Sequence, residues 1–370
     1  MKFSVSRDAL IKPLNLVAGV VERRQTLPIL SNVLMSLEDN RLSLTGTDLE
    51  VELVGRIDVQ SEGADGDITV PARKLVDICK SLPDGVDISF SVEDGKVTVR
   101  AGRSRFTLST LPAAEFPTVE AGDGEIDLDL AQPLVRQMID RTGFAMAQQD
   151  VRYYLNGMYL EIKEGRLRFV ATDGHRLALC TAPGQIAADD KSVIVPRKGI
   201  LELSRLLDGD GSVTLSVGSN HIRAATDQFT FTSKLVDGKF PEYERVLPRS
   251  PDKSVSGDRS ELRQAFTRTA ILSNEKYRGV RLSLTPGSLE ITANNPEQEQ
   301  AEESVPVDYA GDALEVGFNV SYLLDVMGVL TGANVRMSLS DSASSALIEE
   351  GEAGGDTDAE ALYVVMPMRL

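Results

Sequence analysis

Few side chains in this sequence are of the types that carry out covalent or metal chemistry. The chain has two cysteines and two histidines. Cys79 and Cys180 each lie in an apolar stretch, which favours buried free thiols over a disulfide or a metal site. Two cysteines cannot supply a four-thiolate zinc site, and the histidines lie at no spacing that would complete a mixed site. We therefore expect neither a metal nor a redox centre.

Two further patterns have the residue types of an active site. His175 precedes Arg176, but no nucleophile or second base stands in a recognisable motif near it, so a structural histidine or a pocket wall is the better interpretation. Asp48 and Asp173, at equivalent positions of an internal repeat, are possible metal ligands, although turn and cap roles explain them better. The motifs GxxxxGK(S/T), HExxH and GxSxG are missing. We expect no catalytic site and no cofactor.

The phrase Arg152-Tyr153-Tyr154 joins a cation to two aromatic side chains. Such a combination suits contact with phosphates and stacking on the bases of single-stranded nucleic acid. For one of the two tyrosines, packing in the core of a strand is an equally good interpretation.

The length and composition are those of a globular protein with several domains. At 370 residues the chain exceeds one ordinary core, and its length suggests two or three domains. Its residues are 42% hydrophobic, its mean hydropathy is -0.11, and no stretch of about 18 apolar residues occurs. The start, Met1 to Ser6, has no apolar signal region. We expect a cytoplasmic protein without a membrane partner.

A self-similar pattern recurs about every 125 residues, a period too long for a solenoid of small repeats. Each copy opens with a short alternating strand that runs into a capped helix, near Phe3, Leu128 and Ser254. A strand pair with a tight turn follows, and it ends in a polar phrase. The pairs are expected at 34–44, 158–170 and 280–291, and the phrases are Gly46-Thr47-Asp48, Ala171-Thr172-Asp173 and Ala293-Asn294-Asn295.

Each copy continues with a strand, a second helix and closing strands. Pro71 and Pro196 stand at the first turn of two of these second helices, where a missing N–H costs nothing. We therefore expect an α+β fold of three tandem domains, each with two helices against an antiparallel sheet. The breaks between copies have the composition of linkers, and the predicted domains are 1–122, 126–249 and 252–370.

The positive charge is concentrated in the expected helices. The whole chain carries -17 and the six helices carry +5, so the rest carries -22. A net charge of -17 argues at first sight against nucleic acid. Either the basic residues decorate solvated helix faces, which charge alone favours, or the helices share one surface that faces a polyanion. The helices are expected at 7–24, 71–82, 131–150, 196–208, 258–276 and 319–332.

Four phrases, taken in order and at their separations, resemble the bacterial DNA polymerase III beta subunit, the sliding clamp family, over essentially the whole chain. They are Leu44-Thr45-Gly46-Thr47-Asp48-Leu49-Glu50, Ala171-Thr172-Asp173-Gly174-His175-Arg176-Leu177-Ala178, Lys239-Phe240-Pro241-Glu242-Tyr243 and Val364-Val365-Met366-Pro367-Met368-Arg369-Leu370.

The resemblance implies the DNA clamp fold and a ring-shaped head-to-tail homodimer of three-domain protomers. Such a ring encircles double-stranded DNA without reading its sequence. It serves DNA replication as a processivity factor and holds its partners through short linear peptides. These partners are the DNA polymerase III alpha subunit, the clamp loader, other polymerases and repair proteins.

The resemblance places the peptide site in a hydrophobic cleft between the second and third domains. Its apolar side chains offer walls, and methionine thioethers can repack around different ligands. For Met366 and Met368, core filling is the alternative. The residues expected there are Leu155, Thr172, Gly174, His175, Arg176, Leu177, Pro241, Arg245, Val246, Ser345, Val364, Met366, Pro367, Met368 and Arg369.

The resemblance also implies a DNA surface and a dimer interface. The DNA-binding residues are expected to be Arg24, Arg73, Gln149, Tyr153, Tyr154, Arg197 and Lys198. The interface pairs a basic set in the first domain with an acidic set in the third, which favours contact between unlike surfaces. Its residues are expected to be Lys74, Arg103, Arg105, Phe106, Leu108, Ile271, Leu272, Glu297, Glu299, Glu302 and Glu303. Each of the four apolar members is expected to contribute about 2 kcal/mol by burial.

One stretch departs from the family. Residues 349–360 are acidic and Gly-rich, and they form a longer loop than is usual there. We expect this loop to be mobile and to influence peptide selectivity at the nearby cleft.

Overall fold

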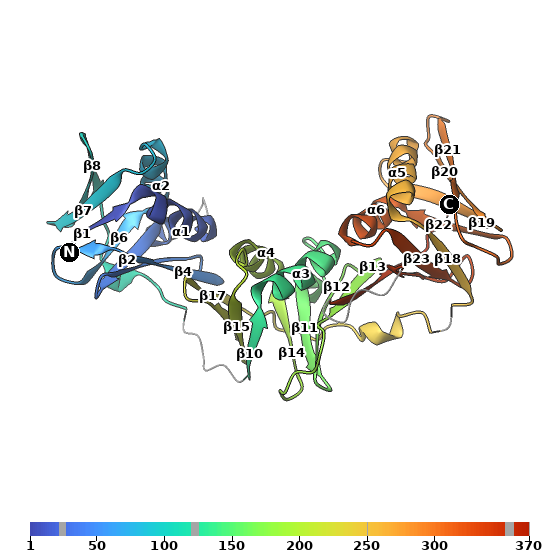
Figure 1. Cartoon of the computed structure of the whole chain (residues 1–370), viewed down its shortest axis with the longest axis horizontal. Helices are drawn as coiled ribbons and strands as arrows, with labels where there is room; N and C mark the ends of the chain where they lie inside the picture. The colour runs from blue at the N-terminus through green and yellow to red at the C-terminus, as the bar shows by residue number, and fades with distance from the viewer. Residues whose placement is uncertain (22–26, 120–125, 250, 352–358, 370) are drawn as a thin grey trace. The chain divides into compact units, whose positions relative to one another are not determined.

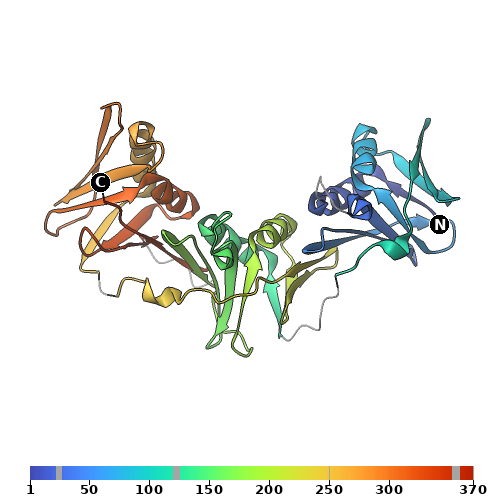
Figure 2. The same cartoon turned by 180° about the vertical axis from the view of Figure 1, so that it is seen from behind.

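The computed structural model describes all residues except 22–26, 120–125, 250, 352–358 and 370. The chain divides into two compact units, each built from two separate segments. Unit 1 consists of Met1–Gln132 and Leu201–Leu235, and unit 2 of Pro133–Ile200 and Val236–Leu370. Figures 1 and 2 show the elements of both units from opposite sides.

Unit 1 holds two antiparallel sheets. The smaller sheet has the order β5-β1-β7-β8-β9, and the larger has the order β10-β15-β16-β17-β4-β3-β2-β6. The larger sheet joins strands of two repeats, because β17 pairs with β4 and places Phe231 opposite Leu53. The strands of the smaller sheet are β5 Gln60–Ser61, β1 Lys2–Ser6, β7 Asp87–Glu93, β8 Lys96–Ala101 and β9 Ser104–Ser109. Those of the larger are β10 Ile126–Ala131, β15 Ser212–Val217, β16 His221–Ala225, β17 Phe229–Lys234, β4 Val51–Asp58, β3 Arg41–Thr47, β2 Asn32–Glu38 and β6 Gly66–Pro71.

Helices α1 (Arg7–Val20) and α2 (Ala72–Ser81) lie side by side in unit 1, and α1 packs on β3 and β4 (Figure 1). The helix α1 begins where the Ser6 hydroxyl accepts a bond from the Ala9 N–H at 3.2 Å, which satisfies a donor that the first turn leaves free. A Cβ atom at Gly46 would lie 2.7 Å from the backbone oxygen of Val17. Glycine at this position therefore lets the helix approach the sheet closely. Two 3-10 turns complete the unit, η1 Pro28–Ser31 and η2 Ala113–Glu115.

Unit 2 is also built on two antiparallel sheets. The larger has the order β14-β11-β12-β13-β25-β24-β23-β18, and the smaller has the order β21-β20-β19-β22. Again strands of two repeats meet, because β13 pairs with β25 and places Leu177 opposite Val364. The larger sheet contains β14 Lys191–Pro196, β11 Gly157–Lys163, β12 Arg166–Thr172, β13 Arg176–Thr181, β25 Glu360–Val365, β24 Ala346–Glu350, β23 Asn334–Leu339 and β18 Lys253–Asp258. The smaller contains β21 Gln300–Pro306, β20 Ser288–Asn294, β19 Gly279–Thr285 and β22 Leu314–Asn319.

Helices α5 (Arg259–Thr269) and α6 (Val320–Val329) pack on each other in unit 2, and α5 also packs on β20 and β21. The helix α3 spans Gln132–Thr142, and α4 spans Arg197–Leu206. The 3-10 turns of the unit are η3 Gly143–Ala145, η4 Tyr153–Leu155, η5 Tyr243–Arg245 and η6 Ala270–Leu272.

The three predicted strand pairs are confirmed, and each closes over a two-residue turn. Asp39 and Asn40 both have positive φ, at 47° and 63°, as a type I′ turn requires. The predicted helices 131–150 and 258–276 are wrong in their last turns, since α3 ends at Thr142 and α5 at Thr269. In both, the threonine hydroxyl donates to the carbonyl four residues earlier, a bond that competes with regular helix. A 3-10 turn follows each time.

Some predictions concern the described residues only in part. Residues 22–24 of the first predicted helix, the breaks near 120–124 and 250, and 352–358 of the acidic loop lie outside the described residues. The flanks of that loop belong to the sheet, as the ends of β24 and β25. Among the described residues, no helix has the length and apolar character needed to cross a membrane. In the same residues, no three His, Cys, Asp or Glu side chains gather as metal ligands.

Candidate functional site

A cavity of about 190 Å³ opens in unit 2 where strand β13 meets the end of β25. Its walls come from four separate stretches of the chain, and most of its lining is apolar or aromatic. An apolar cavity of about 150 Å³ can hold a benzene ring, so this one has room for one or two apolar side chains. The lining residues are Arg152, Tyr154, Leu155, Thr172, Gly174, Arg176, Leu177, Pro241, Glu242, Tyr243, Val246, Val364 and Met366.

The floor of the cavity rests on a hydrophobic cluster of unit 2. Leu155, Leu177 and Val364 belong to both the lining and this cluster, and each is at most 3% exposed. Tyr159 and Phe240 stack below them with ring centroids 4.6 Å apart. The floor is therefore buried and apolar, which suits an apolar ligand group.

A tight turn between β12 and β13 forms one rim. The Asp173 carboxylate accepts bonds from the N–H groups of His175 at 2.9 Å and Arg176 at 3.0 Å, and the Thr172 hydroxyl donates to the Arg176 carbonyl at 2.6 Å. Gly174 has a φ of +89°, and a Cβ atom there would lie 2.9 Å from an Arg152 nitrogen. Only glycine fits this position without strain.

The same turn recurs in unit 1 between β3 and β4. Asp48 accepts from the N–H groups of Glu50 and Val51, and the Thr47 hydroxyl donates to the Val51 carbonyl. The turn roles predicted for Asp48 and Asp173 are thus confirmed. Leu49 takes the place of Gly174, with a φ of 77°.

Arg152 provides a charged side to the cavity. Its guanidinium donates to both carboxylate oxygens of Asp150, at 3.0 and 2.9 Å, and to the Asp173 carbonyl at 3.1 Å. The Arg152 side-chain bond lowers the pKa of Asp150 to about 2. The pair stays ionised at any pH at which the protein would be used.

Arg176 joins the cavity to the helices around it. Its side chain is 12% exposed and pairs with Asp173 at 3.1 Å and with Asp325 of α6. It also donates to the Phe144 carbonyl at 2.9 Å. The guanidinium lies over the rings of Phe144, at 5.2 Å, and Tyr322, at 4.5 Å. Strand β13, turn η3 and helix α6 are therefore fastened at one side chain.

The segment 241–246 forms the remaining wall. Tyr243 is 5% exposed, with its ring in the hydrophobic cluster, while Val246 is 41% exposed. The hydroxyl of Tyr243 donates to Glu161 at 2.5 Å. Burial, followed by the bond to Glu161, raises the pKa of Tyr243.

The structure brings together nine residues that the resemblance assigned to the cleft: Leu155, Thr172, Gly174, Arg176, Leu177, Pro241, Val246, Val364 and Met366. Six others do not line the cavity: His175, Arg245, Ser345, Pro367, Met368 and Arg369. His175 and Arg369 are exposed. The backbone of the terminal segment is fixed, because Met366 donates to the His175 carbonyl and Met368 to the Gly317 carbonyl, both at 2.9 Å.

Four lining residues were missing from the prediction: Arg152, Tyr154, Glu242 and Tyr243. The sequence contains a signal for each pair of residues. Arg152 and Tyr154 stand in the phrase whose residue types suit nucleic acid, and Glu242 and Tyr243 stand in one of the phrases that carry the resemblance. Tyr154 faces the cavity, whereas Tyr153 is 57% exposed and meets Tyr154 edge to face at 5.8 Å.

Among the described residues, the other predicted DNA-binding positions lie on helices, except Gln149, which lies in a bend. Arg73 of α2 and Gln149 are exposed, and Arg197 at the start of α4 is half-buried and donates to the Met146 carbonyl at 3.3 Å. Lys198 of α4 is half-buried. Arg24 lies outside the described residues.

Five of the predicted interface residues lie on two edge strands, one in each unit: Arg105, Phe106 and Leu108 on β9, and Glu302 and Glu303 on β21. Leu108 is only 8% exposed, so it has little area left to bury and the expected 2 kcal/mol is too large for it. Ile271 is 74% exposed, and its turn η6 packs against β20 and β21. Lys74, Arg103, Arg105, Glu297 and Glu299 are exposed, and Leu272 is half-buried.

Three family models match the chain in order. They describe the N-terminal domain of the DNA polymerase III beta subunit over residues 1–120, the central domain over 129–242 and the C-terminal domain over 244–369. The chain belongs to this family. The predicted fold of three tandem clamp domains and the predicted function of a replicative sliding clamp are confirmed with it.

Full-length relatives agree with the family. The beta sliding clamp of Pseudomonas aeruginosa is 66% identical over 372 residues, and that of Escherichia coli strain K12 is 54% identical over 371 residues. Both alignments cover 100% of the two chains. A crystal structure of the Pseudomonas aeruginosa DNA polymerase III subunit beta is 65% identical, with a TM-score of 0.96 and 100% coverage of both chains. A further structure of that clamp, with the same identity, TM-score and coverage, is described as bound to griselimycin.

Proposed function

We propose that two copies of this chain close head to tail around duplex DNA in the cytoplasm, as the processivity subunit of a DNA polymerase III holoenzyme. The cavity beside Leu177 and Met366 holds short peptides of the DNA polymerase III alpha subunit, the clamp loader, other polymerases and repair proteins. The chain has no catalytic step of its own, because closure of the ring retains the DNA. Its three domains span 1–122, 126–249 and 252–370.

The proposal of a closed ring rests on the two smaller sheets, each of which ends in an edge strand without a partner among the described residues. In each eight-stranded sheet, four strands of one repeat join four of the next through the pairs β17·β4 and β25·β13. The smaller sheet of unit 1 ends at β9, which follows β8 as β17 follows β16. The smaller sheet of unit 2 ends at β21, which follows β20 as β4 follows β3. Among the described residues, neither β9 nor β21 has a strand on its outer side.

Joining β9 of one copy to β21 of a second repeats this junction. Two such contacts close a dimer and leave neither edge exposed. The charges support unlike pairing, since Arg103 and Arg105 lie at β9 while Glu302 and Glu303 lie on β21. Ile271 and Phe106 supply the apolar contact that is still available for burial.

For DNA, we propose weak contact from Arg73, Arg197 and Lys198 on the helices and from Arg24, and contact of Gln149, Tyr153 and Tyr154 with single-stranded ends. The modest charge of the helices supports sliding, since each strong phosphate contact would add salt-sensitive tight binding. The exposed ring of Tyr153 is available for stacking on a base.

Retention on a circle tests the ring. The labelled chain is loaded onto a nicked circular plasmid by the clamp loader and ATP, washed in high salt, and separated by gel filtration before and after linearisation. We expect the chain to stay on the circle and to leave the linear form. A chain that behaves alike on both would be an ordinary DNA-binding protein or a scaffold, and the proposal would be wrong.

Peptide binding is tested separately by fluorescence anisotropy. Labelled peptides that tile the alpha subunit are titrated with the chain, and griselimycin is added as a competitor. We expect one region of the alpha subunit to bind and griselimycin to displace it. Binding that is unaffected by Leu177→Asp would place the site elsewhere.

A further inference from the structure

The wall of the cavity formed by 241–246 belongs to no sheet. Among the described residues of 237–249, the backbone bonds between main-chain groups are local, from Arg245 to the Glu242 carbonyl and from Val246 to the Tyr243 carbonyl. The opposite walls, by contrast, lie on or next to the ladder of β13 and β25. Side chains must therefore hold this segment in place.

A polar network under the wall does this. Glu161 of β11 and Arg168 of β12 stand directly opposite each other across the two strands. Their side chains are 10% and 23% exposed and lie 3.2 Å apart. Both bond to the hydroxyl of Tyr243, which donates to Glu161 at 2.5 Å and accepts from Arg168 at 3.2 Å. Each of the three groups thus finds hydrogen-bond partners in the other two, at a place that is largely closed to water.

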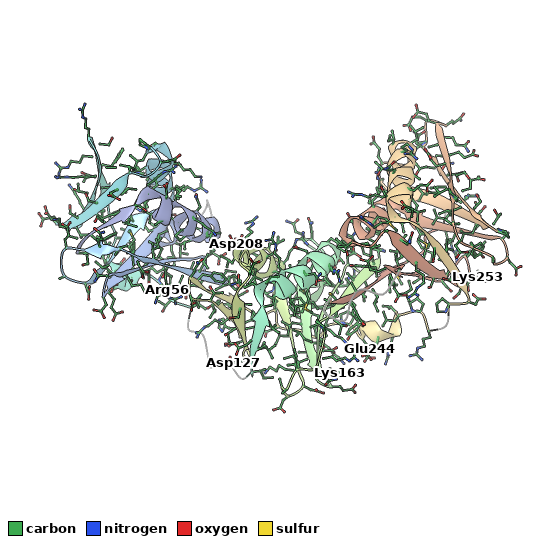
Figure 3. The ribbon with its side chains drawn as sticks, in the orientation of Figure 1. Arg56, Asp127, Lys163, Asp208, Glu244 and Lys253 are labelled. Atoms are coloured by element: carbon green, nitrogen blue, oxygen red, sulfur yellow. The ribbon has the colours of Figure 1, made fainter. Side chains whose placement is uncertain are left out.

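A second, more exposed connection lies beside the first. Glu244 pairs with Lys163 at 3.1 Å and with Arg168 at 3.6 Å. Figure 3 labels Lys163 and Glu244, on β11 and η5 respectively. Consecutive residues of η5 are thus attached to two neighbouring strands, and none of Glu161, Lys163, Arg168 and Glu244 lines the cavity.

We propose that Glu161 and Arg168 are positioning residues for the cavity: through the hydroxyl of Tyr243 they set the depth of its ring and hence the width of the space that receives a partner's apolar side chain. The inference rests on the proposed peptide-binding function. The ring of Tyr243 touches the ligand, and its hydroxyl, on the far side from the cavity, acts only through position.

The main test removes that hydroxyl and nothing else. Tyr243→Phe keeps the ring and its apolar contacts. Its matched control is Tyr309→Phe, because Tyr309 is 4% exposed, lies in the same unit and donates at 2.5 Å to the Asp312 carbonyl, away from the cavity. Tyr243→Phe loses the two hydrogen bonds of its hydroxyl and Tyr309→Phe loses one, so both are expected to lower the melting temperature.

The probes are griselimycin and the alpha-subunit peptide that binds the unaltered chain most tightly. Only Tyr243→Phe should lower the affinity for these probes. The expected loss is about tenfold, the factor that corresponds to about 1.4 kcal/mol. It should appear as faster dissociation at an unchanged association rate, since a loosened wall holds the ligand less well.

Glu161 gives a rescue. Glu161→Ala leaves the Tyr243 hydroxyl without its acceptor and should weaken the probes about tenfold, whereas Glu161→Gln keeps an oxygen at that place and should stay within about threefold of the unaltered chain. A merely structural role would lower the melting temperature of both variants without separating their affinities.

The outcomes are distinct. If Tyr243→Phe binds like Tyr309→Phe, or if Glu161→Gln binds no better than Glu161→Ala, the positioning role is refuted while the peptide site stands. If the unaltered chain binds neither griselimycin nor any peptide, the proposed function fails, and the inference fails with it.

Discussion

Replacement of Arg176 tests whether one side chain holds helix α6 to strand β13. Arg176→Ala removes the bond to the Phe144 carbonyl, the pair with Asp173 and the two ring contacts. It also removes the pair with Asp325, a carboxylate that is 46% exposed and therefore adds little.

The cost can be worked out from these contacts. A hydrogen bond from a charged donor contributes about 1.5–3 kcal/mol, and a cation–π contact about 0.5–1 kcal/mol. Of these partners only Tyr322 and Asp325 belong to α6, since the bonds to Phe144 and Asp173 are not broken when the helix opens. The contributions share one side chain and are not additive, so we expect the free energy for opening α6 to fall by about 1.4 kcal/mol. This corresponds to about tenfold faster amide exchange in α6.

Native-state hydrogen exchange with mass spectrometry measures this on the peptides of α6. Arg281→Ala is the matched control, because Arg281 pairs with Glu315 at 2.9 Å on the surface of the same unit and its side chain is 44% exposed. That pair should be worth less than about 1 kcal/mol. The exchange rate of α6 in Arg176→Lys should fall between those of Arg176→Ala and Arg281→Ala. Lysine keeps the charge but has no planar guanidinium to stack on the rings or to donate to two acceptors at once.

If α6 exchanges in Arg176→Ala within about threefold of its rate in the unaltered chain, Arg176 does not hold the helix. Equal acceleration in every helix of unit 2 would also contradict the reasoning, because it would indicate global destabilisation.

Three other predictions follow from the same structure. Ala at both Ile271 and Leu272 should shift the chain from dimer to monomer in sedimentation velocity at micromolar concentration, with a loss of about 2 kcal/mol for the exposed isoleucine; an unchanged dimer would contradict the interface. Deletion of 366–370 should abolish peptide binding while circular dichroism keeps its melting transition, because it removes a cavity wall and two backbone bonds but no strand; normal titration would count against the cleft. Burial raises the pKa of Cys79 to about 11 and of Cys180 to about 12, so neither thiol should react with a disulfide reagent at pH 8 until the chain unfolds. Because the thiol pKa values are higher in the folded than in the unfolded state, the free energy of unfolding is highest below the unfolded pKa of about 8.5 and declines as pH rises above it. Rapid labelling of the folded chain would refute the burial.

The local features that were predicted correctly depend on neighbouring residues. The turn at Asp39-Asn40 forms because both residues tolerate positive φ, as does Gly165 in the turn at Glu164-Gly165, and the turn roles of Asp48 and Asp173 use backbone groups two and three residues away. The ends of α3 and α5 were predicted too far along, since apolar spacing continues past the threonines that end both helices.

The triplicate repeat, its hairpins and the family membership were thus determined by the sequence alone, because each can be recognised in short stretches and their order. The cavity was decided only by tertiary structure. Its lining comes from 152–155, 172–177, 241–246 and 364–366, and no periodicity relates these stretches. Burial sorted the residues further, since it turned Tyr154 toward the cavity, left Tyr153 exposed and covered Leu108. Such choices depend on how strands of different repeats pair, a long-range property that local residue patterns do not contain.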